Sequence, residues 1–332
     1  MSVLKFFARA AILTLLLSFA WQVRGQVHSS SAYRYLLDEK EMLGHLEFLA
    51  SDTIAGRAAG SPQALAVAGY IAGKFESYGL EPFSGDEFLQ HFKIAASGKL
   101  SGRTVQGKNL DGYNVVGYIP AKEKFAPYIV VGAHFDHIGS FGEKFYPGAD
   151  DNASGVASML AIARALGKRY VERNDFRHNI VFVAFDGNNH NLSGSRAFIQ
   201  SSRIPLHRVS FMVNLDQIGS TLASVGEFDE YLLVLGAEKL EPWQKGQLDF
   251  ANDFFGLGLY LDYTYYGSSQ FYNIFYRLSD QQTFTEKGIP ALLFTSGITG
   301  HTNKESDVVE NLSLDVLLRR TELVYRFLWL LD

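Results

Sequence analysis

Apolar residues follow two spacings along this chain, and these spacings predict where helices and strands lie. Helical spacing marks residues 38–49, 62–78, 153–166, a segment from Ser195 and 312–331. Near-continuous apolar runs predict strands at 127–133, 179–185 and 209–215, and further strands are expected at 88–95, 114–119, 231–236 and 291–295. A loop or hairpin is expected over 97–112.

From Pro127 onward strands and helices alternate, which is typical of an α/β protein. Strands that are apolar throughout are expected where helices cover both faces of a sheet. The pattern therefore predicts a three-layer α/β/α fold with a mainly parallel mixed central sheet.

The amino-terminal residues have the pattern of a secretory signal peptide. Lys5 and Arg9 flank an apolar segment over 10–21, and Val23-Arg24-Gly25 precedes a polar stretch. We expect cleavage after Gly25, an exported (periplasmic or secreted) protein, and one domain over 26–332; a signal-anchor that stays uncleaved is the alternative. No later stretch approaches the ~18 uninterrupted apolar residues of a membrane span, so no stable span is expected after cleavage.

Composition narrows the possible partners. The chain of 332 residues has no cysteine, so an exported protein of this sequence forgoes disulfides and cysteine acylation. Its net charge is −5, and removal of residues 1–25 takes away three basic residues (Lys5, Arg9 and Arg24) and no acidic one, leaving −8. This balance argues against nucleic acid or anionic lipid as a partner.

Polar residues follow several of the predicted strands at the points where they end. His134 follows the run 128–131, Asp151 lies in the turn before the next helix, Asp216 follows 211–215, and His301 follows the strand at 291–295. Zinc binds imidazole nitrogen and carboxylate oxygen, and the carboxyl ends of parallel strands meet at one edge of a sheet. These four residues are therefore the candidate metal ligands. Taken singly, Asp151 would be a helix cap and His301 a surface histidine.

Two neighbours of His134 have different expected roles. Asp136 lies two residues further along an extended chain, and it suits a carboxylate behind the metal ligand that fixes the histidine tautomer. His137 is expected to be structural.

Several short motifs, in a fixed order, make the chain resemble the zinc aminopeptidases of peptidase family M28, the co-catalytic enzymes that include bacterial leucyl aminopeptidases and glutamate carboxypeptidase. The matching pieces are Leu49-Ala50-Ser51-Asp52 with Ala55-Gly56-Arg57, Tyr113-Asn114-Val115-Val116-Gly117, Ala133-His134-Phe135-Asp136-His137, residues 148–155, Leu192-Ser193-Gly194-Ser195, Asn214-Leu215-Asp216 and His301-Thr302. The resemblance implies two metal ions that share Asp151. One ion would also be held by His134 and Asp216, and the other by His301 and a glutamate.

That glutamate, and the one before it, are absent. The family has a Glu-Glu pair about six residues before the Gly-Ser that matches Gly194-Ser195, and this chain has Asn188 at the position of the general base and Asn189 at that of the ligand. An amide does not accept a proton at neutral pH, and loss of general acid-base help typically costs ~10²–10⁴ in rate. Two carboxylates balance a single divalent ion, so we expect one zinc ion or none. Asp186 is a possible substitute base and His190 a possible substitute ligand.

The leading hypothesis is a catalytically impaired member of the family that retains binding of a peptide or protein amino terminus, a metal ion, or both. One alternative is an active metallo-aminopeptidase that uses a substitute base. A glutaminyl cyclase-like enzyme and a pure interaction module are the others. The aromatic-rich segment 254–276 could wall a pocket for an apolar side chain or carbohydrate, although core packing suits most of it.

Overall fold

The computed structural model describes residues 36–83, 85–95, 97–100, 103–106, 109–201, 204–223, 228 and 230–332. The predicted signal peptide, residues 1–25, lies outside them. Within the described residues the strands are β1 (Glu81–Pro82), β2 (Leu89–Ile94), β3 (Ser97–Leu100), β4 (Arg103–Gln106), β5 (Leu110–Ile119), β6 (Tyr128–His134), β7 (Gly139–Phe141), β8 (Lys144–Tyr146), β9 (Asn179–Phe185), β10 (Val209–Leu215), β11 (Tyr231–Leu235), β12 (Tyr260–Asp262) and β13 (Ala291–Thr295). The α-helices are α2 (Glu39–Leu49), α3 (Pro62–Ser77), α4 (Gly155–Arg173), α5 (Ser193–Ser201), α6 (Pro242–Phe254), α7 (Ser269–Phe275), α8 (Gln281–Thr285) and α9 (Leu314–Leu331).

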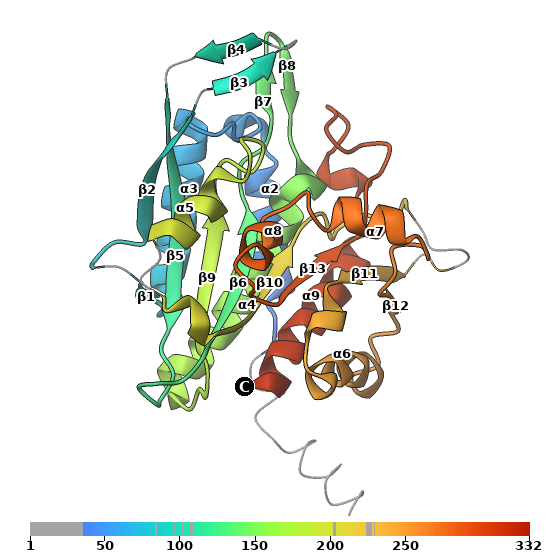
Figure 1. Ribbon diagram of the computed structural model, residues 1–332. Coiled ribbons are helices and arrows are strands. Elements are labelled where there is room, and N and C mark those ends of the chain that lie inside the picture. Colours follow the sequence, from blue (N-terminus) through green and yellow to red (C-terminus); the bar gives the residue numbers. More distant parts are fainter. Residues whose placement is uncertain are drawn as a thin grey trace, which may run out of the picture. The chain divides into compact units, whose positions relative to one another are not determined.

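Nine strands form one mixed sheet (Figure 1). Their order is β1-β5-β9-β6-β10-β13-β11-β12, with β2 also paired to β5. The central strands β9, β6, β10 and β13 are parallel, whereas β5 pairs with β9, and β11 with β13, in antiparallel fashion. The parallel centre brings the carboxyl ends of β6 and β10 side by side, and the antiparallel strands lie toward the edges.

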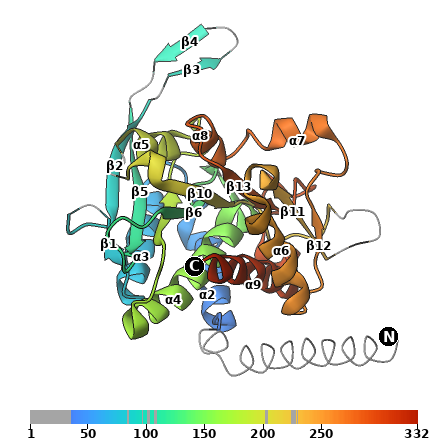
Figure 2. The same cartoon turned by 60° about the horizontal axis from the view of Figure 1, so that its bottom comes forward.

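Helices cover both faces of this sheet (Figure 2). Helices α2, α3, α4 and α9 pack on one face, where α4 contacts α2, α9 and β6. Helices α5 and α8 pack on the other face, on β5, β10 and β13. Every residue of β9 is buried, because helices cover the sheet on both faces. The predicted α/β/α fold with a mixed central sheet is thereby confirmed.

Capping residues explain the ends of helix α3. Ser61 precedes the helix and its hydroxyl accepts a hydrogen bond from the backbone N–H of Ala64 at 3.1 Å. Pro62 occupies the first turn, where its missing N–H costs nothing. Gly79, with φ of +78°, follows the last turn in the left-handed conformation that glycine adopts most easily.

The sequence pattern missed the short elements β1, β7, β8, β12 and α8, and the helices α6 and α7. In α6 only Leu248 and Ala251 are buried, whereas the large apolar residues Trp243 and Phe250 are 56% and 47% exposed. Helix α7 has no buried residue. Their apolar residues therefore do not mark a core-facing stripe, and periodicity gives no signal. No helix in the described part of the chain is both long enough and apolar enough to cross a membrane.

Gly155 sets the close approach of α4 to strand β10. A methyl group on this residue would collide with the carbonyl oxygen of Leu215 and with the side chain of Asn152. The helix therefore begins directly behind the end of β10, where Asp216 follows.

We expect Gly155→Ala to destabilise the fold by roughly 1–3 kcal/mol through overpacking, although alanine is the better helix former. Gly69→Ala in α3 is the matched control, because a methyl group there meets no atom within 4 Å. That control is expected to leave the free energy of unfolding unchanged or to raise it by up to about 1 kcal/mol. Urea denaturation measures both, and equal effects of the two substitutions would contradict the packing argument.

Candidate metal centre

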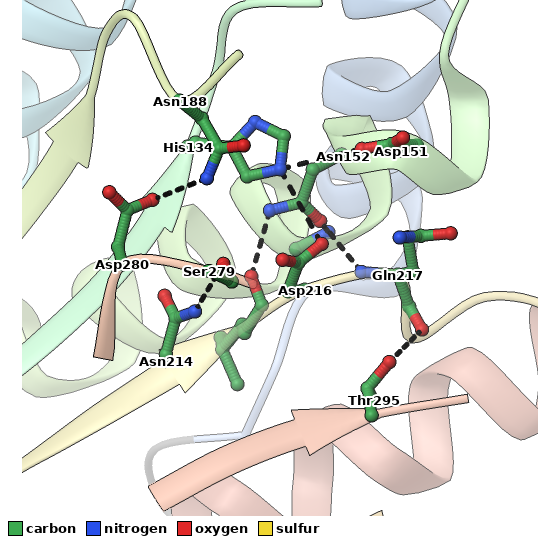
Figure 3. A network of polar contacts seen from close by, with 12 residues as sticks. His134, Asp151, Asn152, Asn188, Asn214, Asp216, Gln217, Ser279, Asp280 and Thr295 are labelled. Carbon is green, nitrogen blue, oxygen red and sulfur yellow. Dashed lines mark hydrogen bonds and ion pairs between the residues drawn. The ribbon is translucent and has the colours of Figure 1, made fainter. Parts of the chain in front are cut away.

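Three of the predicted ligands meet at the carboxyl edge of the parallel strands (Figure 3). His134 is the last residue of β6, Asp216 follows β10, and Asp151 lies in the distorted turn 149–154 before α4. His134 Nε2 lies 3.4 Å from an oxygen of Asp151 and 3.4 Å from an oxygen of Asp216. One nitrogen and two carboxylate oxygens, all within 4.8 Å of one another, suit a divalent ion with a further open position.

The electrostatics of this cluster favour a cation. All three side chains are buried, and Asp216 Oδ1 accepts no hydrogen bond. Burial lowers the pKa of His134, but the negative charges of Asp216 and Asp151 outweigh it and raise that pKa well above its usual value. The two buried carboxylates thus stabilise a positive charge between them. In the absence of metal this charge is the second proton of His134, and a bound metal ion would replace that proton.

Asp136 fixes the histidine ring through its backbone rather than its carboxylate. His134 Nδ1 lies 3.0 Å from the Asp136 carbonyl oxygen and 3.8 Å from its Oδ1. With the proton on Nδ1 donated to this carbonyl, the lone pair of Nε2 faces Asp151 and Asp216. The Asp136 carboxylate instead accepts the backbone N–H of Asn188 at 2.9 Å, so the predicted role of this side chain is corrected. This contact holds the loop that contains Asn188 and Asn189, the asparagine loop, beside the metal ligands.

Arg57 holds the backbone around the site. Its guanidinium is fully buried and donates hydrogen bonds to the carbonyl oxygens of Leu49, Phe135, Pro147, Gly148 and Asp151, at 2.5 to 3.5 Å. Burial lowers the pKa of Arg57 to about 10, which leaves it charged at neutral pH. One side chain thus joins α2, the end of β6 and the turn that carries Asp151.

Asp307 supports Asp151 from the other side, and the sequence analysis did not identify it. Its two carboxylate oxygens accept the backbone N–H groups of Asp150 and Asp151 at 2.8 and 3.1 Å. Its position six residues after His301 carries no pattern that distinguishes it from a surface aspartate. The peptide bond between Asp151 and Asn152 is cis.

The asparagine pair lies at the pocket beside this cluster. Asn188 and Asn189 both line a pocket of about 250 Å³. Asn188 Nδ2 donates to Asp280 Oδ2 at 3.1 Å, and Asp280 has no exposed surface (Figure 3). The other lining residues are His134, Asp151, Asp216, Gln217, Tyr265, Phe275, Leu278, Ser279, Leu293, Thr295, Gly297, Ile298, Thr302 and Asn303.

The structure places the remaining candidates elsewhere. Asp186 is buried beside a second pocket with Ser61 and Tyr113, and its Oδ2 accepts the backbone N–H of Tyr113 at 3.0 Å. His190 is exposed and is not among the residues that line the pocket beside the metal cluster. His301 is not in the three-residue cluster, and its Nδ1 lies 2.8 Å from Ser306 Oγ.

His137 and the aromatic segment lie closer to the site than expected. His137 is buried, and its Nδ1 is 3.8 Å from Asp151 Oδ2. Tyr265 and Phe275 stack with ring centres 4.4 Å apart and line the pocket, whereas Tyr276 is buried. The segment thus forms one wall of the pocket as well as packing into the core.

A His-Asp-Asp cluster at the carboxyl ends of parallel strands offers a donor set that suits a divalent metal ion. The sequence model for "Peptidase family M28" matches residues 114–328. The chain belongs to this family.

Relatives and solved structures agree with this assignment. Aminopeptidase YwaD of Bacillus subtilis is 30% identical over 141 residues, which cover 42% of this chain and 28% of that protein. A probable zinc metalloprotease of Pyrenophora tritici-repentis is 31% identical over 120 residues, or 35% of this chain and 26% of that protein. The matched part of the chain thus spans about a quarter of the length of these curated relatives.

Two solved structures show the likeness of the fold. The zinc aminopeptidase BSAP of Bacillus subtilis has a TM-score of 0.69 at 18% identity, with 90% of this chain and 96% of that chain covered. The glutaminyl cyclase of Porphyromonas gingivalis has a TM-score of 0.64 at 17% identity, with 90% and 99% covered. Family and neighbours together make zinc the metal that this cluster is expected to hold.

We expect Arg57→Lys to lower the free energy of unfolding by roughly 3 kcal/mol or more, because lysine leaves several buried carbonyl groups without a donor. Zinc affinity should fall by roughly tenfold, since the turn that carries Asp151 is no longer held. Thermal unfolding and zinc titration measure the two effects.

Arg169→Lys is the control. This mostly buried arginine pairs with Asp175 and Asp332 near the far end of α4 and lies against Phe176. Its substitution should destabilise the fold without changing zinc affinity, and a similar loss of zinc affinity in both variants would contradict the role of Arg57.

Proposed function

We propose that this protein is an exported, catalytically impaired member of peptidase family M28 that binds one zinc ion and a peptide amino end. The amino-terminal signal pattern supports export. His134, Asp151 and Asp216 would hold the zinc ion, which when bound would polarise a carbonyl group and acidify water. One ion balances the charge of the two carboxylates.

The proposal that catalysis is impaired is supported by the side chains that line the pocket. Asp151 and Asp216 are the two carboxylates among the described residues that line it, and both belong to the metal cluster. Asn188 occupies the position matched to the general base, and its amide is engaged by Asp280. No lining carboxylate is left over to take a proton from water or pass one to a leaving amine.

The two residues predicted from the sequence as a possible substitute base and a possible substitute ligand do not supply the missing group. Asp186 contacts Tyr113 away from the pocket lining, and His190 does not line the pocket. Asp280 is fully buried behind Asn188, so it reaches the pocket only through that amide. Binding is therefore the activity that this geometry supports best.

The first test is the zinc content of residues 26–332. We expect one zinc ion per chain, and zinc at 100 times its dissociation constant should stabilise the fold by about 2.7 kcal/mol. Asp216→Ala should abolish binding because it removes one of three ligands. His301→Ala is the control and should retain the ion. Two bound ions in the native chain, or loss of the ion in the control, would contradict a single site on these three residues.

The second test is hydrolysis of a panel of aminoacyl and dipeptidyl fluorogenic amides, with an amino-terminal glutamine peptide included for cyclisation. The zinc-loaded native chain should be slower than Asn188→Glu/Asn189→Glu by roughly 10²–10⁴, because the double variant restores the acid-base group and a ligand. His134→Ala in the double variant is the control for metal dependence. Native activity that the double variant does not exceed would overturn the impairment, and cyclisation by the native chain would identify a cyclase.

A further inference from the structure

The hydrogen bond between Asn188 and Asp280 determines which end of the asparagine amide faces the pocket. A carboxylate only accepts hydrogen bonds, so Asp280 Oδ2 must be met by the NH₂ end of Asn188, at 3.1 Å. The carbonyl oxygen of the amide is then turned away from Asp280 and toward His134 (Figure 3). Asn188 thus offers an acceptor to the pocket.

Both partners of this hydrogen bond are held rigidly. The backbone N–H of Asn188 donates to Asp136 Oδ1 at 2.9 Å, which fixes the loop. Asn214, on β10, donates through Nδ2 to Ser279 Oγ at 2.9 Å and to Gln281 Oε1 at 2.8 Å. These contacts clamp the residues on either side of Asp280 to the strand that leads to Asp216. The amide therefore has little freedom to turn over.

The charge of the pocket agrees with an acceptor at this position. Its described lining contains two carboxylates and neither lysine nor arginine. One zinc ion neutralises the two carboxylates, so no positive group remains to attract an anion. A ligand group beside Asn188 must donate a hydrogen bond, and a protonated amine does so most strongly because it is charged.

We propose that Asp280 is a positioning residue that locks the oxygen of Asn188 toward the pocket, so that the pocket selects a protonated primary amine, the free amino end of a peptide. The inference rests on the proposed function, since the amine would bind beside the zinc cluster. In this proposal Asn188 does not transfer a proton, but its carbonyl oxygen still recognises the amino end.

The experiment compares binding of L-leucinamide and N-acetyl-L-leucinamide to zinc-loaded residues 26–332 by calorimetry. The native chain should bind the free amine roughly tenfold more tightly than the acetylated compound, because one hydrogen bond to a charged group is lost on acetylation. Asp280→Leu frees the NH₂ group of Asn188, and the preference should fall to within about twofold. Asp280→Asn keeps an acceptor oxygen for Asn188, and an intermediate preference is expected.

Two further variants make the result decisive. Asp332→Asn removes a different buried carboxylate and should keep the full preference, since its side chain accepts the backbone N–H groups of Arg177 and His178. Asn188→Ala deletes the acceptor at a partly exposed position and should abolish the preference, which decides the question even if Asp280→Leu does not fold.

The outcomes separate this inference from the proposed function. Equal binding of both compounds by a chain that holds zinc overturns amine selection and leaves the zinc site standing. Full preference in Asp280→Leu or Asn188→Ala overturns the orienting role. Failure of the native chain to bind zinc contradicts the proposed function instead, and it is measured independently on the same samples.

Discussion

The buried guanidinium of Arg57 is the interaction on which the site depends. It satisfies carbonyl groups from three segments that are far apart in sequence, and those segments would otherwise meet with unpaired polar groups in the interior. The carboxylate of Asp307 supports the same turn by accepting the backbone N–H groups of Asp150 and Asp151. Charged side chains therefore hold the backbone, and the backbone places Asp151 opposite His134. The turn has non-helical residues at Asp151 and Asn152, and the side chain of Asn152 adds a hydrogen bond to the carbonyl oxygen of Leu215.

The asparagine pair is consistent with its surroundings. Next to a fully buried carboxylate such as Asp280, a second carboxylate would experience repulsion, whereas an amide donates a hydrogen bond and partly compensates the buried charge. Burial raises the pKa of Asp280 to about 6, although His134 and the amide of Asn188 lower it. The amide of Asn188 thus avoids the repulsion that a second carboxylate would experience beside Asp280.

Fold and chemistry separate clearly in this protein. Its sheet and helices follow those of zinc aminopeptidases and a glutaminyl cyclase at 17–18% identity, and a shared fold does not decide which reaction occurs. The chemistry depends on side chains at a few strand ends. The metal cluster combines a nitrogen with two carboxylates, while the adjoining pocket wall offers amides and stacked aromatic rings.

The sequence by itself determined the parallel strands β6, β9 and β10 at the centre of the sheet and the placement of His134 and Asp216, because buried parallel strands are apolar throughout and their carboxyl ends meet at one edge. The positions of Asn188 and Asn189 in the site were predicted from their offset before Gly194-Ser195 in the resemblance to the family. Only the tertiary structure revealed Arg57 as a backbone clamp and Asp280 as the partner of Asn188. The hydrogen bonds of Arg57 reach residues 78 to 94 positions away, apart from Leu49, and Asp280 lies 92 residues from Asn188. Local hydrophobic periodicity contains no information about such distant polar contacts, which arise only when the folded chain brings their donors and acceptors together.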